Sequence, residues 1–141
     1  MYITQYTDYA LRILLFSASN PDRLINIAEV AQAFDISKSH LTKVAAQLTR
    51  SGVLKSVRGK GGGLCLGQAA AAINVGAVVR LMEPLALVEC HGQDNHCVIS
   101  PHCRLAGVLQ QALQAFLAVL DQYSLADLVG QPALVQMLRR D

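Results

Sequence analysis

Three cysteines lie close together near the middle of the chain, Cys90, Cys97 and Cys103, in the pattern C-x6-C-x5-C. Thiolate sulfur is a soft donor that stabilises iron-sulfide cores, and an irregular loop lets three thiolates converge on one face of a cluster. Structural zinc sites more often use C-x2-4-C pairs, so this spacing favours iron-sulfur over zinc. Zinc, redox-active thiols and thiols without a metal role remain alternatives.

Histidines accompany these cysteines. His91, His96 and His102 each adjoin one of them, so any of the three could supply a fourth ligand, although an exposed loop histidine is the more common role. Cys65 lies far from the trio in a predicted strand. We interpret it as a small apolar strand residue, not a ligand.

Positive charge is concentrated in the first half of the chain. Residues 1–63 carry eight Lys or Arg against four Asp or Glu, whereas residues 64–141 carry four against six. No acidic residue occurs from residue 36 to residue 82. This pattern is typical of a surface that meets a phosphate backbone, and a solvated helix face is the alternative.

The basic region contains a predicted helix-turn-helix. Apolar residues at helical spacing predict a first helix over residues 2–18. Asn26 and Glu29 form a capping-box pattern at the start of a second helix, and Ser37 is placed to cap a third, whose outer face is polar and basic. The third helix can therefore enter a major groove. Its candidate DNA contacts are Ser37, Lys38, Ser39, His40, Thr42 and Lys43.

A hairpin follows this predicted helix. Strands over residues 53–57 and 64–66 flank the run Arg58-Gly59-Lys60-Gly61-Gly62-Gly63. Glycines allow positive φ and a close backbone approach, so Arg58 and Lys60 at the tip could reach phosphates or the minor groove as a wing does. The run matches neither the P-loop nor the G-x-G-x-x-G pattern, which argues against a nucleotide cradle.

The rest of the chain is predicted to be helical. Asn74 caps a fourth helix that runs to Met82, and Ser100-Pro101 opens a long helix whose apolar residues follow steps of four and three as far as Tyr123. That apolar stripe is broader than one short chain needs, so it predicts a dimer interface, with an intramolecular core as the alternative. Ser124 caps a short terminal helical segment.

Together these patterns predict a mostly α protein: a winged helix-turn-helix with a small β wing plus a long C-terminal dimerisation helix. We expect a DNA-binding domain over residues 1–83, a cysteine cluster-binding loop over 84–104, and a dimerisation helix with a C-terminal tail over 105–141. No apolar stretch approaches the roughly 18 residues of a membrane span, so we expect a cytoplasmic protein with reduced thiols. No nucleophile-base pair, paired-carboxylate site or phosphate loop suggests an enzyme.

In their order along the chain, several segments resemble the family of dimeric winged-helix regulators that includes NsrR and IscR. The likeness covers nearly the whole chain: the opening Met1-Tyr2-Ile3-Thr4, the run Asp8-Tyr9-Ala10-Leu11-Arg12, the wing Val57 to Leu64, the cysteine loop and the long helix. The resemblance implies a homodimer that binds double-stranded DNA at an inverted-repeat operator.

The cysteine segment from Cys97 to Leu105 resembles that of the nitric-oxide-sensing repressors in this family. The resemblance implies a [4Fe-4S] cluster, with [2Fe-2S] as the alternative, whose nitrosylation releases the dimer from DNA. IscR-like members carry a histidine ligand at the position of Ala106, so that ligation is not expected here. NsrR-like members can complete the cluster with an aspartate from the partner subunit's first helix, which corresponds to Asp8; an ordinary salt-bridged acid is the alternative.

Other functions remain possible at this stage. The chain could be an iron-sulfur or redox-sensing regulator of cluster assembly, a zinc- or thiol-switched winged-helix regulator, or an electron-transfer or cluster-carrier protein. Six residues separate the first two cysteines, where many relatives have five, which leaves the cluster type open.

Overall fold

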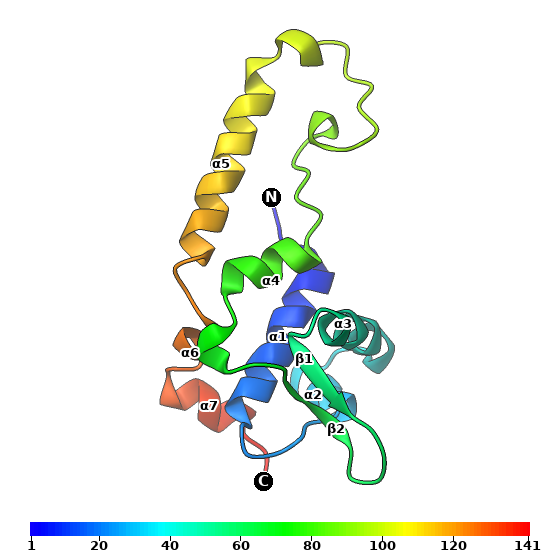
Figure 1. Ribbon diagram of the computed structural model, residues 1–141, viewed down its shortest axis with the longest axis vertical. Coiled ribbons are helices and arrows are strands. Elements are labelled where there is room, and N and C mark those ends of the chain that lie inside the picture. Colours follow the sequence, from blue (N-terminus) through cyan, green and yellow to red (C-terminus); the bar gives the residue numbers. More distant parts are fainter.

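The computed structural model describes all 141 residues and is mostly helical (Figure 1). Its helices are α1 (Gln5–Ser19), α2 (Ile27–Phe34), α3 (Lys38–Arg50), α4 (Val75–Met82), α5 (Arg104–Leu120), α6 (Leu125–Leu128) and α7 (Pro132–Leu138). Strands β1 (Leu54–Val57) and β2 (Gly63–Leu66) form one antiparallel sheet. Three short 3-10 turns are η1 (Ala70–Ala72), η2 (Glu89–His91) and η3 (Ser100–His102). The predicted fold class, a winged helix with a small β wing, is confirmed.

Helix α1 lies at the centre of the main core, where α3, α4, α6 and α7 all pack against it. Residues three to four positions apart lie on the same face of a helix, and on the inner face of α1 Ala10, Ile13 and Leu14 are fully buried. They join Leu41 and Val44 of α3 in the same cluster. Helix α3 therefore packs directly on α1.

Three of the four predicted helix caps are formed as expected. Asn26 and Glu29 make the reciprocal capping box of α2, the Asn74 side chain accepts from an amide in the first turn of α4, and Ser124 forms a capping box with Asp127 at the start of α6. The cap predicted at Ser37 is wrong: the residue occupies the N-cap position, but its side chain makes no capping hydrogen bond. Its hydroxyl lies 2.9 Å from the Oγ of Ser39 instead.

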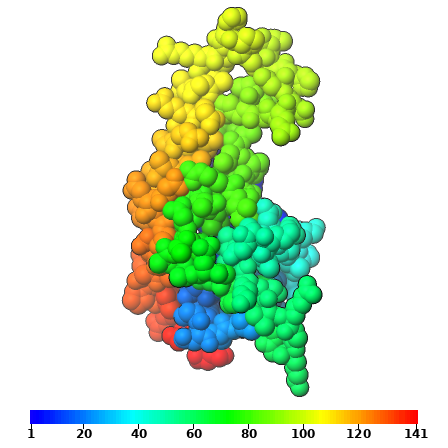
Figure 2. Space-filling view, viewed as in Figure 1, coloured from blue at the N-terminus to red at the C-terminus, as the bar shows by residue number.

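The wing is fastened to the domain along one edge. Leu54 pairs with Leu66 and Val57 with Gly63, so the tip spans residues 58–62. Ile25, just before α2, exchanges two backbone hydrogen bonds with Leu64, at 2.9 and 2.8 Å. Because Ile25 and Leu54 are both buried, the base of the wing belongs to the core while its tip projects away from it (Figure 2).

The long helix begins later than its sequence suggests. Residues 100–102 form the separate turn η3, Cys103 has extended backbone, and α5 runs only from Arg104 to Leu120. The lower part of α5 packs on α4 through Val79, Leu113 and Leu117. The upper part of α5 and the cysteine loop rise together as a lobe beyond the winged domain (Figure 1).

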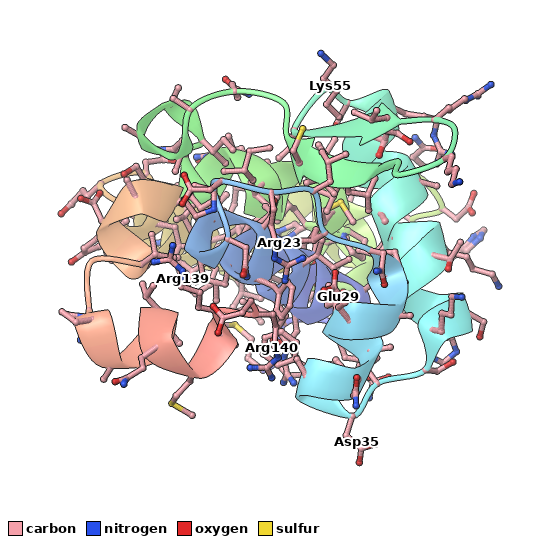
Figure 3. The ribbon with its side chains drawn as sticks, turned by 90° about the horizontal axis from the view of Figure 1, so that it is seen from below. Arg23, Glu29, Asp35, Lys55, Arg139 and Arg140 are labelled. Carbon is pink, nitrogen blue, oxygen red and sulfur yellow. The ribbon has the colours of Figure 1, made fainter.

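The C-terminal residues return to the winged domain. Leu125 of α6 and Leu138 of α7 are buried in the main core, and α7 itself was not predicted from the sequence. Asn20, which ends α1, donates its Nδ2 to the Leu138 carbonyl at 3.0 Å and accepts the Arg140 amide at 2.9 Å. Arg23, Glu29 and Arg140 lie near one another (Figure 3), and the Arg23 guanidinium donates to the Glu29 carboxylate and to the Arg140 carbonyl.

No helix of the structure is both long and apolar enough to cross a membrane.

Candidate DNA-binding face and cysteine loop

Helix α3 presents a polar and basic outer face. Leu41, Val44, Ala45 and Leu48 hold its inner face in the core. All six residues predicted to contact DNA on this helix are exposed: Ser37, Lys38, Ser39, His40, Thr42 and Lys43. The Thr42 hydroxyl donates to the Lys38 carbonyl at 2.8 Å, whereas the side chains of Lys38 and Lys43 are exposed. Such a face suits a phosphate-lined groove.

The wing tip carries two further exposed cations. Arg58 and Lys60 alternate with Gly59 and Gly61, whose φ angles of +98° and +78° lie in the region open to glycine. The tip can therefore turn tightly while both bases point outward. None of the bases of α3 and the wing takes part in any of the ion pairs of the chain, so their charge is not compensated internally.

The position of α3 is fixed by polar contacts as well as by the core. The Tyr6 hydroxyl of α1 donates to the Lys43 carbonyl at 3.3 Å. The Gln47 side-chain amide donates to the carbonyl of Leu81, near the end of α4, at 3.2 Å. These two hydrogen bonds join α3 to α1 and to the end of α4.

The cysteine loop is built from turns. Cys90 lies in η2, Cys97 follows an Asx turn in which its amide donates to the Asn95 side chain at 3.0 Å, and Cys103 separates η3 from α5. Glu89 accepts the His96 amide at 2.7 Å, which ties the two halves of the loop together. All three thiols are half-buried and none forms a disulfide.

The structure does not bring the predicted ligands together. No group of three or more His, Cys, Asp or Glu side chains is placed to hold a metal ion. Cys65 lies in β2 opposite Lys55, with its Sγ 3.9 Å from the Lys55 carbonyl, so it belongs to the wing. The assignment of Cys90, Cys97 and Cys103 as ligands stays a prediction.

The histidines of the loop differ in their surroundings. The Nε2 of His91 lies 2.9 Å from the carbonyl of Ala106, whereas its Nδ1 is buried without a hydrogen-bond partner. A ring held at one nitrogen with the other left free is the arrangement of a metal-ligating histidine, since the second-shell bond fixes the tautomer. His96 and His102 are exposed.

Asp8 lies in the first turn of α1 and is half-exposed. Its carboxylate pairs with Arg12 one turn later, at 2.8 Å between Oδ2 and Nη2 and 3.2 Å between Oδ1 and Nε. The Arg12 guanidinium also lies over the rings of Tyr9 and Phe34, 6.0 and 5.6 Å from their centroids. Within one chain Asp8 is thus an ion-paired acid.

A carboxylate from the start of the cysteine loop holds the N-terminus of α1. Glu83 accepts the Thr4 amide at 3.2 and 3.1 Å and the Thr4 hydroxyl at 2.9 Å, and it also accepts the Thr7 hydroxyl. Thr4 is the N-cap of α1, and Thr7 is buried. Sequence reasoning missed this contact, because nothing in the pattern of either segment indicates a partner more than seventy positions away.

The donor set fits an iron-sulfur group on chemical grounds. Three free thiols lie on one segment whose backbone forms only short turns, and a buried imidazole nitrogen without a partner lies beside the first. Ion pairs do not tie up any of these side chains.

Comparison with known proteins agrees with this architecture. Residues 3–131 match the Rrf2 family, described as iron-dependent transcriptional regulators. The chain is 48% identical over 132 residues to the HTH-type transcriptional regulator NsrR of Bacillus licheniformis, which covers 92% of each protein.

Solved structures resemble the whole chain. CymR, the global cysteine regulator of B. subtilis, superposes with a TM-score of 0.70 at 25% identity, covering 92% of this chain and 96% of that one. IscR of T. potens gives a TM-score of 0.69 at 21% identity, covering 92% and 86%. The second likeness is one of fold alone.

Proposed function

The chain belongs to the Rrf2 family of iron-dependent transcriptional regulators, and from that premise we propose that it is a homodimeric repressor whose hold on operator DNA is controlled by nitric oxide through an iron-sulfur cluster. The observation that carries the proposal is the combination of an uncompensated basic face on α3 and the wing with three free thiols on the loop that follows α4, whose end is hydrogen-bonded to α3. The similarity to NsrR of Bacillus licheniformis supports nitric oxide as the signal.

The proposed DNA contact places α3 in the major groove and the wing tip on phosphates or in the minor groove. Ser37, Lys38, Ser39, His40, Thr42 and Lys43 line the first contact, and Arg58 and Lys60 the second. Because bound Lys and Arg displace condensed counterions, affinity is expected to fall steeply with salt. Two such faces in a symmetric dimer would read the two halves of an inverted repeat.

The proposed dimer interface is the unpacked apolar surface of α5. Leu105, Val108 and Val119 are 60%, 52% and 54% exposed, and an apolar cavity of about 630 Å³ opens beside α5 between the N-terminal residues and the start of the cysteine loop. Phe116 and Leu85 line that cavity. Apolar surface of this extent on a helix face is typical of a subunit interface.

The proposed cluster ligands are Cys90, Cys97 and Cys103, with Asp8 of the partner subunit as the fourth for a [4Fe-4S] group. His91 is the alternative fourth ligand, because its Nδ1 is buried and free. A bound cluster supplies iron that reacts with nitric oxide. The chain's own part is to hold the thiolates in one loop and to offer a hard oxygen ligand, which binds iron more weakly than thiolate does.

The first experiment measures iron, sulfide and the visible spectrum of the protein purified without oxygen, then titrates nitric oxide while operator binding is followed by fluorescence anisotropy. We expect about four irons per protomer and loss of DNA binding as nitric oxide is added. Zinc or no metal, with DNA binding indifferent to nitric oxide, would refute the proposal. Peroxide and oxygen titrations on the same DNA distinguish a nitric oxide sensor from a regulator of cluster assembly.

Variants assign the ligands. Cys97→Ala should abolish the cluster and leave a folded dimer. Asp8→Ala and His91→Ala separate the two candidates for the fourth position: the true ligand gives a more labile cluster with an altered spectrum, while the other variant behaves as the wild type. If neither changes the spectrum or the rate of reaction with nitric oxide, both are excluded.

A further inference from the structure

We propose that Glu83 is a positioning residue that transmits the state of the cysteine loop to the DNA-reading helix. The inference rests on the proposed function, since it concerns how that loop controls DNA binding. It is carried by a separate observation: a single carboxylate at the start of the loop holds the first turn of α1, against which α3 packs.

The N-terminus of α1, where Glu83 binds, favours a negatively charged carboxylate. The first amides of a helix have no partner within the helix and carry partial positive charge, so an acceptor with full negative charge is stabilised there. Glu83 takes the Thr4 amide and the hydroxyls of both Thr4 and Thr7. It has no ion-pair partner, so these hydroxyl and amide donors alone hold the carboxylate.

The contact leads to α3 by two short routes. Tyr6, on the same turn of α1, donates to the Lys43 carbonyl at 3.3 Å, and Lys43 is one of the proposed DNA contacts. Gln47 of α3 donates to Leu81, two residues before Glu83, at 3.2 Å. The end of α4 is thus joined to both the helix that supports α3 and α3 itself.

The contact is also joined to the thiols. Glu83 is the C-cap of α4 and its backbone is already extended, with φ −98° and ψ 132°, so it is the first residue of the loop. Pro84 follows it, and proline restricts the backbone conformation of the residue before it. Seven positions separate Glu83 from Cys90. The backbone of the loop therefore connects the first thiol to Glu83 over a short stretch of chain that contains no α-helix.

The test compares the operator dissociation constant of protein without cluster to that of protein with cluster. The coupling ratio is the first constant divided by the second. Glu83→Gln keeps the shape of the side chain but removes its charge, and we expect it to lower the ratio by about tenfold, within the usual range of coupling between sites. Iron and sulfide per protomer should be unchanged. Thr7→Val, which removes a donor, should act in the same direction, and the double variant should not add to either.

Asp94→Asn is the matched control, because it removes the same charge from the same loop and Asp94 is an exposed residue that forms no ion pair. Its coupling ratio should equal that of the wild type. A ratio for Glu83→Gln within twofold of the wild type, with the cluster intact, overturns the inference. If Glu83→Gln does not fold, Thr7→Val decides by the same criterion.

Hydrogen exchange provides a reading that does not depend on the cluster. Glu83→Gln should raise amide exchange several-fold both in residues 4–10 and in residues 41–50, whereas a merely local role would raise it only in the first segment. Unchanged exchange in residues 41–50 overturns the inference even where nitric oxide releases DNA. If the wild type binds the operator equally well with and without the cluster, the proposed function fails. The exchange data still decide whether Glu83 is linked to α3.

Discussion

Replacing Asn20 by alanine should detach α7 from the winged domain. Asn20 is 4% exposed and makes three hydrogen bonds through its side chain. Its Nδ2 donates to the carbonyls of Phe16 at 2.8 Å and Leu138 at 3.0 Å, and its Oδ1 accepts the Arg140 amide at 2.9 Å. The side chain thus joins the end of α1 to the end of the chain.

The expected loss of stability follows from what the alanine leaves behind. Leu138 is 7% exposed, so its carbonyl has little access to water once the donor is removed, and an unsatisfied buried group costs about 1–3 kcal/mol. The Arg140 amide lies at the surface and can bind water, so the loss of its hydrogen bond to Asn20 adds about 0.5–1 kcal/mol. We expect a decrease of about 3 kcal/mol in the free energy of unfolding, or about 10 °C in Tm for a chain of this size.

The measurement is urea and thermal unfolding followed by circular dichroism, at one fixed protomer concentration because dimerisation also stabilises the fold. Asp22→Ala is the control. Asp22 joins the same turn to Arg139 by an exposed ion pair of 3.3 Å, with side chains 82% and 57% exposed, so its removal should cost less than about 0.5 kcal/mol. If the two variants lose the same stability, the buried hydrogen bonds of Asn20 do not anchor α7 and the reasoning fails.

Three further predictions concern the wing, the start of α2 and the fourth cysteine. Gly67→Ala should destabilise the protein by about 1–3 kcal/mol in urea unfolding, because a Cβ at Gly67 would lie 2.0 Å from the backbone oxygen of Gly52; wild-type stability would contradict it. Burial raises the pKa of Glu29, but hydrogen bonds from Arg23 and the Asn26 amide outweigh burial and leave that pKa below its ordinary value. The stabilisation of the fold by Glu29 should therefore be full above the ordinary pKa and should be lost as pH falls through the lowered pKa. Acid unfolding of Glu29→Gln should accordingly show less dependence on pH between about 5 and 3, and an unchanged pH profile would remove Glu29 from this role. Cys65→Ala should retain the iron content and DNA affinity of the wild type, and loss of iron would place Cys65 among the ligands.

Local patterns were sufficient to predict the DNA-binding half. The apolar repeat of α3, the capping box of Asn26 and Glu29, and the glycine-rich tip between the strands are each local in sequence, so each could be predicted without knowledge of the fold. Ser37 shows the limit of this reasoning. The residue type and position were right for a cap, but the neighbouring hydroxyl of Ser39 competes for its side chain.

The cysteine loop could be predicted only in part. The spacing of the thiols indicates a soft metal site, but their approach to one another depends on turns whose geometry no periodicity describes. The fourth ligand is still harder to predict from the sequence, since the proposed candidates are Asp8 of the partner subunit and His91. The free Nδ1 of His91 becomes visible only when the Ala106 carbonyl is placed 2.9 Å from the other ring nitrogen.

The start of α1 shows how a contact between distant segments can accompany a shifted helix boundary. Apolar spacing alone extends the helix back to residue 2, but the structure begins it at Gln5, with Thr4 as the cap. At this boundary the Glu83 carboxylate accepts hydrogen bonds from the Thr4 amide and hydroxyl. Local propensity is overridden where a distant group supplies stronger bonds, and such sites are often the ones on which function depends. The residue bound to the helix start is the same one that begins the cysteine loop, and the proposed link between the thiols and α3 rests on this contact.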